Sequence, residues 1–253
     1  HLDWHETMED YFTSKARLFT EYASFTDRMD GVVNIDDPWG PRLVEIAECP
    51  ITTCGMERDA DVTASAVSLS ADGTTFTLCT PSAQAKVRLQ LVGLFNVYNA
   101  ICAAGCCVAL GIPDEDIAAG LQAAEPVAGR LERVEANQDF AVLVDYAHTP
   151  EALENVLKTC RALDTGKLIC VFGCGGDRDR TKRPQMGRIA AQLADTAIVT
   201  SDNPRSEDPA EIIAQIQAGM PSGEYHIEPD RRSAIQQACE LAGVSDIVVI
   251  AGK

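Results

Sequence analysis

The residues best suited to binding a charged ligand form a polar stretch just beyond the apolar, β-branched run 196–199, namely Asp202-Asn203-Pro204-Arg205. The guanidinium of an arginine can clamp a carboxylate through two hydrogen bonds, whereas a lysine offers only a point charge. The competing interpretation of Arg205 is a surface salt bridge, for example to Asp208, which contributes little. Spacing alone does not decide between a carboxylate site and a salt bridge.

A glycine-rich turn and a basic cluster precede this stretch. Gly173-Cys174-Gly175-Gly176 would let backbone amides approach an anion closely, although such a run is more often simply a tight turn. The basic cluster is either a local anion site or a solvated face, with equal weight, because Asp177 and Asp179 are interleaved with it. Its members are Arg178, Arg180, Lys182, Arg183 and Arg188.

Other residue types invite a function but are ambiguous by themselves. Asp145 and His148 follow another apolar run and could bind or orient a nucleotide, although a lone histidine is more often structural. Lys15 lies in a helical pattern, where most lysines are solvated. His1 and His5 lie near it in the sequence, but two histidines and a lysine are not a recognised set of metal ligands.

The bulk composition excludes several classes of function. With 253 residues and 46% apolar side chains, the chain can build a sizeable core. A net charge of −17 argues against nonspecific binding to nucleic acid or to anionic membranes. No segment resembles a transmembrane helix or a signal peptide, so we expect a cytoplasmic protein. Ten cysteines without any Cys-x-x-Cys pair are expected to be free thiols.

Mixed patterns characterise the first half of the chain. Two alternating runs, 64–69 and 75–78, flank Asp72-Gly73 and predict a β-hairpin. Apolar periodicity predicts helices over 7–22, 42–47, 98–110 and 113–123, and strands over 31–35 and 87–92. Proline and glycine in the segment 125–130 predict a hinge, and we place a domain boundary after residue 126.

Beyond the hinge, strands and helices alternate regularly, which predicts an α/β domain with a parallel, doubly wound sheet. The strands are expected over 140–144, 168–172, 196–200 and 247–251, and the helices over 151–163, 184–193, 209–218 and 233–242. Each polar motif then follows a strand, as does Gly252-Lys253 at the end of the chain. Because the carboxyl ends of parallel strands share one edge, all these motifs should line that edge.

Several motifs, in this order, resemble those of the Mur ligase family, and the resemblance covers essentially the whole chain. It implies that residues 1–126 are the carboxyl-terminal part of a central ATPase domain and that 127–253 form a Rossmann-like domain that receives an amino acid. The motifs are Asn34-Ile35-Asp36-Asp37, Phe95 to Ala100, Gly129 to Glu132, Asp145 to Pro150, Phe172 to Asp179, Lys182-Arg183-Pro184 and Asp202 to Arg205.

The resemblance also implies roles for individual residues. Lys15 becomes a carbamylated lysine whose anionic oxygen suits magnesium, with His1 as the other nearby metal ligand. Lys15 and Arg130 are the implied catalytic residues, and Arg130 also contacts phosphate. The implied ATP contacts are Asn96, Asn99, Arg130, Asp145 and His148, and the implied amino-acid contacts are Arg178, Asp202, Asn203, Pro204 and Arg205.

The activity implied by the resemblance is ATP-dependent addition of meso-diaminopimelate to UDP-N-acetylmuramoyl-L-alanyl-D-glutamate, through an acyl phosphate. Arg205 would pair with the distal carboxylate of diaminopimelate, which lysine lacks. Magnesium and Arg130 would offset the charge on the transferring phosphoryl group. We expect a monomer that binds no nucleic acid and does not insert into membranes.

The chain departs from the family in one respect, because no G-x-x-x-x-G-K-[ST] phosphate loop occurs in it. We therefore expect a fragment that does not turn over ATP by itself. Two alternatives stay open at this point. One is a lysine-adding or folylpolyglutamate-type ligase, against which Arg205 weighs, and the other is a noncatalytic module that binds a nucleotide or an amino acid.

Overall fold

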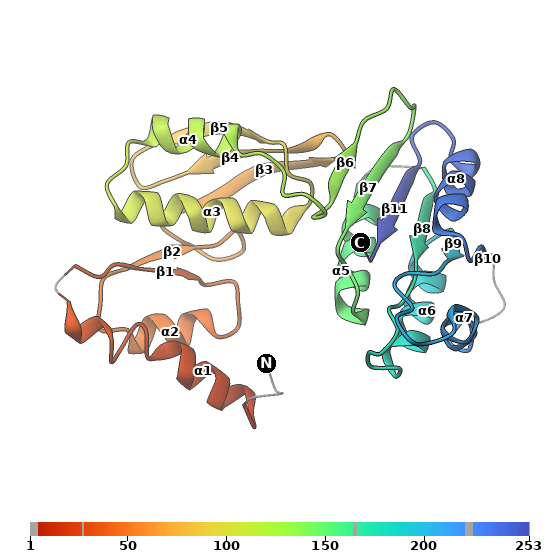
Figure 1. The fold of residues 1–253 in the computed structure, drawn as a ribbon. Helices are drawn as coiled ribbons and strands as arrows, with labels where there is room; N and C mark the ends of the chain where they lie inside the picture. The colour runs from red at the N-terminus through yellow and green to blue at the C-terminus, as the bar shows by residue number, and fades with distance from the viewer. Residues whose placement is uncertain (1–4, 27, 164–165, 221–224, 253) are drawn as a thin grey trace. The chain divides into compact units, whose positions relative to one another are not determined.

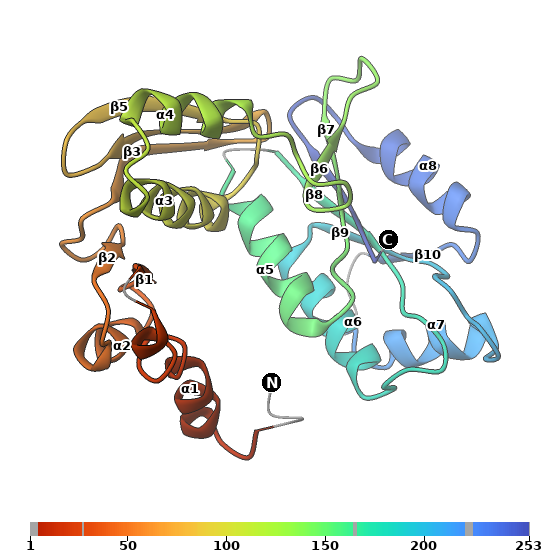
Figure 2. The same ribbon diagram turned by 60° about the vertical axis from the view of Figure 1, so that its left-hand side comes forward.

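The computed structural model describes residues 5–26, 28–163, 166–220 and 225–252, which fall into two compact units (Figures 1 and 2). The first unit comprises His1–Ser68, Gly73–Gln90 and Leu94–Ala124, and the second comprises Leu69–Asp72, Leu91–Gly93 and Glu125–Lys253. No helix in the described part of the chain is both long enough and apolar enough to cross a membrane. All ten cysteines are free, which confirms the prediction from the sequence.

Two small sheets and their helices build the first unit (Figure 1). One sheet pairs β1 (Gly31–Asn34) in parallel with β2 (Ile51–Cys54), and the other has the order β3 (Thr63–Ser70), β4 (Gly73–Cys79), β5 (Gln84–Leu89). The expected hairpin is confirmed, and its turn needs glycine because Gly73 has φ +126°. The helices are α1 (Met8–Ala16), η1 (Ala23–Phe25), α2 (Gly40–Ile46), α3 (Leu94–Ala109) and α4 (Asp114–Ala123).

The first helix is shorter than predicted, since α1 ends at Ala16 instead of continuing to residue 22. Thr7 caps its start by accepting a hydrogen bond from Asp10 N at 3.1 Å. At its end the Ala16 carbonyl accepts bonds from the backbone of Phe19 and from both the backbone and the hydroxyl of Thr20, which turns the chain. The Phe19 ring then packs against the backbone of Gly31, so a tertiary contact overrides the helical pattern.

A six-stranded sheet forms the centre of the second unit, with the order β10-β9-β8-β11-β7-β6. All neighbouring pairs are parallel except β6 with β7, so the predicted parallel sheet is confirmed and carries one antiparallel edge strand. The strands are β6 (Glu132–Val134), β7 (Ala141–Asp145), β8 (Leu168–Phe172), β9 (Thr196–Val199), β10 (Tyr225–Ile227) and β11 (Ile247–Ala251). Sequence patterns missed β2, β6 and β10, which are short and, in β6 and β10, lie at sheet edges.

Helices cover both faces of this sheet, as a doubly wound fold requires (Figure 2). One core joins residues of α5 (Pro150–Arg161), α6 (Lys182–Leu193) and α7 (Pro209–Gln217) to one face of the strands. A smaller core places Ala234 and Ala238 of α8 (Arg231–Leu241) on the opposite face. Every residue of β8 and β11 is buried, which explains their uninterrupted apolar sequences.

Candidate functional site

The loops that follow the parallel strands of the second unit enclose a cavity of about 620 Å³. It lies beyond the carboxyl ends of β7, β8, β9 and β11, so the prediction that these motifs share one edge is confirmed for the described residues. Lys253, which was expected at the same edge, lies outside the described residues. The charged residues that line the cavity are Glu151, Arg178, Asp179, Lys182, Asp202 and Arg205. Side chains of both signs suit a ligand that itself carries both charges.

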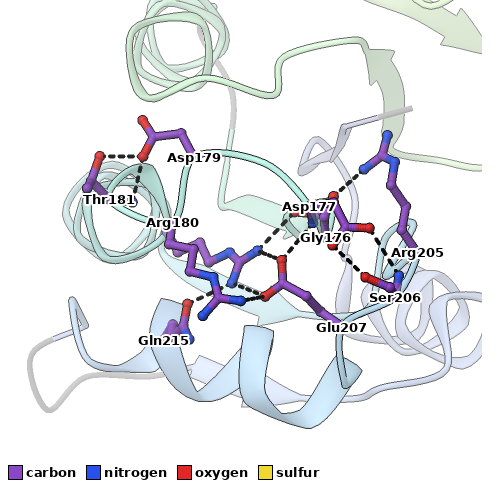
Figure 3. A network of polar contacts seen from close by, with 11 residues as sticks. Gly176, Asp177, Asp179, Arg180, Thr181, Arg205, Ser206, Glu207 and Gln215 are labelled. Atoms are coloured by element: carbon purple, nitrogen blue, oxygen red, sulfur yellow. Dashed lines mark hydrogen bonds and ion pairs between the residues drawn. The ribbon is translucent and has the colours of Figure 1, made fainter.

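Arg205 lies at the rim of this cavity in the left-handed conformation, with φ +50°. Its Nη1 donates a hydrogen bond to the carbonyl of Gly176 at 2.5 Å, which directs the guanidinium along the neighbouring loop (Figure 3). Asp208 does not pair with it, because the Asp208 carboxylate caps α7 by accepting Ala210 N at 2.9 Å. The surface salt bridge between Arg205 and Asp208 is therefore absent from the described contacts, and most of the donors of Arg205 stay available.

The glycine-rich turn packs against the loop that carries Arg205. A Cβ atom on Gly173 would lie 2.4 Å from the Thr200 carbonyl oxygen, and one on Gly176 would lie 1.8 Å from that of Pro204. The Gly176 amide donates to the carbonyl of Asn203 at 2.8 Å, so that amide does not face an anion. These glycines therefore allow two backbones to approach closely, which is the tight-turn interpretation of the run.

The basic cluster separates into different environments. Arg178 and Lys182 line the cavity, and Lys182 Nζ also donates to the carbonyl of His148 at 2.8 Å. Arg183 is fully buried and pairs with Glu207, which also pairs with Arg180. Arg188 is exposed on α6. The solvated-face interpretation therefore describes Arg188, whereas an anion site at Arg178 and Lys182 stays a prediction.

Three residues predicted to contact the nucleotide, together with Tyr146, lie close to one another where β7 ends. The buried Asp145 carboxylate accepts hydrogen bonds from the backbone amides of Leu131 and Ala147, both at 2.8 Å. This fixes the turn that carries Arg130, whose guanidinium carbon lies 5.2 Å from the centroid of the Tyr146 ring. The Tyr146 and His148 rings meet edge to face at 4.9 Å. The structure thus groups Arg130, Asp145 and His148, and adds Tyr146, which the sequence did not single out.

The two asparagines predicted to contact adenine lie one turn apart at the start of α3, in the first unit. Asn99 Nδ2 donates to Asn96 Oδ1 at 3.1 Å; Asn96 is buried and Asn99 is exposed. Between them in sequence, Tyr98 donates its hydroxyl to Asp36 at 2.9 Å, and burial together with this bond raises the pKa of Tyr98 to about 12. The bond anchors the first turn of α3 to the loop after β1.

Lys15 lines a second cavity of about 420 Å³ in the first unit, formed by α1, α2 and the end of β1. Asn34 and Asp37 line the same cavity. Lys15 Nζ lies over the Tyr11 ring, 5.5 Å from its centroid. Among the described residues, no group of three or more His, Cys, Asp or Glu side chains could hold a metal ion. His1, predicted as a metal ligand, lies outside the described residues.

Besides Tyr146, sequence reasoning also missed Glu207 in this region. It lies two positions after Arg205 and just before the capped helix α7. From the sequence alone it has the features of an ordinary surface carboxylate. Its side chain is only 7% exposed, because Arg183 reaches it from α6. The one signal in the sequence was the cluster of arginines that includes Arg180 and Arg183, in a strongly acidic chain. That cluster does not specify which carboxylate each arginine pairs with.

Comparisons with known proteins agree with this geometry. The family model of the Mur ligase middle domain matches residues 1–107, and the model of the Mur ligase glutamate ligase domain matches residues 129–253. A UDP-N-acetylmuramoyl-L-alanyl-D-glutamate--2,6-diaminopimelate ligase of Bacillus licheniformis is 47% identical over 256 aligned residues, covering 100% of this chain and 52% of that protein. The ligase of the same name from Gloeobacter violaceus is 50% identical, with 51% of that protein covered. The chain spans about half the length of the curated relatives that it matches.

Solved structures share the fold of this chain. A structure of a UDP-N-acetylmuramoyl-L-alanyl-D-glutamate--2,6-diaminopimelate ligase superposes with a TM-score of 0.75 at 37% identity, covering 100% of this chain and 52% of the other. The folylpolyglutamate synthase of Thermotoga maritima shares the fold at 20% identity and a TM-score of 0.71, covering 95% of this chain and 55% of the other. The two family models together account for both units, and the chain belongs to the Mur ligase family.

Proposed function

We propose that this chain supplies the amino-acid-receiving part, and a portion of the ATP site, of a ligase that joins meso-diaminopimelate to UDP-N-acetylmuramoyl-L-alanyl-D-glutamate. The observation that carries the proposal is Arg205, whose guanidinium is held at the rim of a cavity of mixed charge. The names of the relatives at 47% and 50% identity support the same substrates. The proposal divides the chain at residue 126 and treats the protein as a monomer.

The cavity matches the charges of diaminopimelate, which has an ammonium and a carboxylate at each end. Arg205 and Arg178 would bind the distal carboxylate, and Asp202 would accept a hydrogen bond from the distal ammonium. Asn203 lines the cavity and would contribute to this surface, whereas Pro204 does not line it and would act by packing its backbone against Gly176. Lysine has no distal carboxylate and would leave Arg205 desolvated without a partner, which disfavours it.

On the nucleotide side, we assign adenine contacts to Asn96 and Asn99 and a phosphate contact to Arg130. The guanidinium of Arg130 is exposed and oriented by the Tyr146 ring, so its donors can reach a phosphate. Each oxygen of the Asp145 carboxylate accepts one backbone amide and keeps further lone pairs for a ribose hydroxyl, beside His148.

A magnesium ion fits the cavity of the first unit only in part. Asn34 and Asp37 offer oxygen atoms beside Lys15, and carbamylation of Lys15 would add an anionic oxygen ligand. Magnesium usually keeps several waters and binds one or two carboxylates together with phosphate oxygens, so water and phosphate would have to complete this donor set. When bound, the ion would offset negative charge on the transferring phosphoryl group.

The reaction proposed has two steps. The glutamyl carboxylate of the UDP-linked dipeptide attacks the γ-phosphorus of ATP, which forms an acyl phosphate and releases ADP. The free amine of diaminopimelate then attacks the acyl carbon, and a tetrahedral intermediate collapses to the amide and inorganic phosphate. Arg130 would stabilise charge on the transferring group in the first step, and Arg205 would hold the amino acid for the second.

The proposal is tested by measuring ADP release by the natural full-length protein with the UDP-linked dipeptide and either diaminopimelate or lysine. We expect turnover with diaminopimelate and a kcat/KM for lysine lower by about 100-fold or more. Preference for lysine or for a glutamate acceptor would reject it in favour of the other family activities. If calorimetry detects binding of ATP or diaminopimelate but no ADP forms, the protein is a noncatalytic binding module.

A further inference from the structure

A buried ion pair lies directly beneath the loop that carries Arg205. Arg183, fully buried on α6, donates from Nη1 to Glu207 at 2.9 Å and from Nη2 to the other carboxylate oxygen at 2.8 Å. The same guanidinium donates to Gln215 of α7 at 2.7 Å and to the carbonyl of Gly175 at 3.3 Å. This single side chain therefore connects α6, α7, the glycine-rich turn and the loop after β9.

Glu207 uses both of its carboxylate oxygens within this network. Besides Arg183, it accepts a hydrogen bond from the Asp177 amide at 2.6 Å and lies 3.0 Å from Nη2 of Arg180. The hydrogen bonds from Arg183 and from the Asp177 amide lower the pKa of Glu207 to about 2, so it is ionised at any assay pH. With four donors already on its carboxylate, Glu207 has little capacity left for a substrate.

A second set of bonds joins the same two loops nearer the cavity. The Ser206 hydroxyl donates to Asp177 at 2.7 Å, and the Ser206 amide donates to the other Asp177 oxygen at 3.2 Å. Asp177 and Arg205 both adopt left-handed backbone conformations, with φ +52° and +50°. Such conformations cost a non-glycine residue about 1–2 kcal/mol each, so they persist where surrounding contacts hold them.

From this geometry we infer that Arg183 and Glu207 are positioning residues for the incoming amino acid, a role that rests on the proposed function. They fix the turn Arg205-Ser206-Glu207 against Gly175 to Asp177 before any ligand arrives, so that the Arg205 guanidinium already lies at the cavity. Prior ordering of a binding group removes its entropic cost from the binding step. The pair therefore strengthens binding of a ligand with a distal carboxylate without contacting it.

The decisive variant is Glu207→Gln in the natural full-length protein, with Glu211→Gln as the matched control. The substitution keeps the size of the side chain but removes the charge that holds Arg183, whereas Glu211 is an exposed carboxylate in the first turn of α7. We expect the KM for diaminopimelate to rise at least about tenfold, because small displacements of a positioning group are costly. For Glu207→Gln, the KM for ATP and the kcat at saturating diaminopimelate should stay within about twofold of those of the parent protein. The control Glu211→Gln should have the same kcat and KM values as the parent protein.

Glu207→Asp and Ser206→Ala extend the test. Glu207→Asp keeps the charge on a shorter side chain and should recover part of the lost affinity. Ser206→Ala removes one exposed hydroxyl bond to Asp177 and leaves the buried pair intact, so it should raise the KM for diaminopimelate by about threefold. If Glu207→Gln fails to fold, as thermal melting would reveal, Glu207→Asp decides the outcome, since it should still raise the KM for diaminopimelate above that of the parent protein.

Three results would overturn the inference. One is an unchanged KM for diaminopimelate in folded Glu207→Gln or, where that variant does not fold, in Glu207→Asp. Another is a fall in kcat with all KM values unchanged, which would mark a purely structural role. A third is an equal rise in the KM values for ATP and diaminopimelate. Failure of the proposed function is distinguishable, because the unmodified protein would then show no diaminopimelate-dependent ADP release, and the inference would fall with it.

Discussion

The cavity lined by Arg205 and the cavity lined by Lys15 hold their polar groups in different ways. In the second unit, Arg205 is bonded to the glycine-rich turn, and the loop beside it is bonded to a buried ion pair. In the first unit, the cavity around Lys15 has a largely apolar lining that includes Phe12 and Trp39. There the side-chain oxygens of Asn34 and Asp37 accept backbone amides of their own turns, from Asp36 at 3.0 Å and Trp39 at 2.8 Å.

This difference indicates two ways of preparing a site. The cavity that Arg205 lines is prearranged by contacts within one unit, because its loops leave adjacent strands of the same sheet. The Lys15 cavity has its polar groups engaged in local turns, so a metal there would depend on ligands that the described side chains do not by themselves supply. Substitutions around Arg205 should therefore act through the geometry of ligand binding. Substitutions around Lys15 should act through assembly of a metal site.

Arg205→Ala should have the largest effect of these variants. If it had none, the cavity around Arg205 would not be a prearranged binding site. Removing the guanidinium that would bind the distal carboxylate should lower kcat/KM for diaminopimelate by about 1,000-fold, because that carboxylate would then enter the cavity without a partner. Steady-state ADP release by the full-length protein measures it. Arg188→Ala, on the exposed side of α6, is the matched control and should change kcat/KM by less than twofold.

Lys15→Arg tests whether the Lys15 cavity needs a modified lysine. Arginine keeps the positive charge but cannot lose the proton that carbamylation requires, so kcat should fall by about 100-fold. Turnover across a magnesium titration measures the loss, and mass spectrometry of the gently handled parent protein would detect the carbamate. Lys86→Arg, at an exposed position of β5, should behave like the parent. Full activity of Lys15→Arg would show that the residue acts as a cation alone.

Gly176→Ala sharpens the claim that the glycine-rich turn serves close packing. Its new Cβ would meet the Pro204 carbonyl oxygen at 1.8 Å, so the two loops must separate, with a loss of about 1–3 kcal/mol of stability. Thermal melting should show a fall of about 2–4 °C per kcal/mol. Gly120→Ala in α4, where nothing lies within 4 Å of the added atom, should instead stabilise by about 0.5–1 kcal/mol. Equal melting temperatures for both variants would contradict the packing role.

The pH dependence of stability gives the smallest expected effect. The folded-state pKa of Glu207 is about 2, below its ordinary value of 4.5, so the folded state favours the ionised carboxylate. Its contribution is fully present above pH 4.5 and disappears as the pH falls through about 2. The difference in unfolding free energy between the parent and Glu207→Gln should therefore shrink steadily over that range. A difference that stays constant down to about pH 2 would show that the charge of Glu207 does not stabilise the fold.

Local patterns were sufficient for much of the second unit. The apolar runs of β7, β8, β9 and β11, and the capping signal at Asp208, predicted both the elements and the shared edge where the polar loops gather. The prediction of a helix over 7–22 was wrong at its end, because α1 stops at Ala16 where Phe19 turns to contact Gly31. Short strands such as β6 and β10 carry too few residues for alternation to be detected.

Sequence by itself determined the family, the doubly wound sheet and the candidate carboxylate clamp at Arg205, because each depends on motifs or periodicities that are local along the chain. Only the tertiary structure decided that Arg205 does not pair with Asp208, that the glycines make room for a neighbouring backbone, and that Glu207 is paired with Arg183. The glycine contacts and the ion pair depend on distances between segments 24 or more residues apart. Neither residue type nor spacing encodes such distances, since the sheet register and helix packing that set them form only on folding.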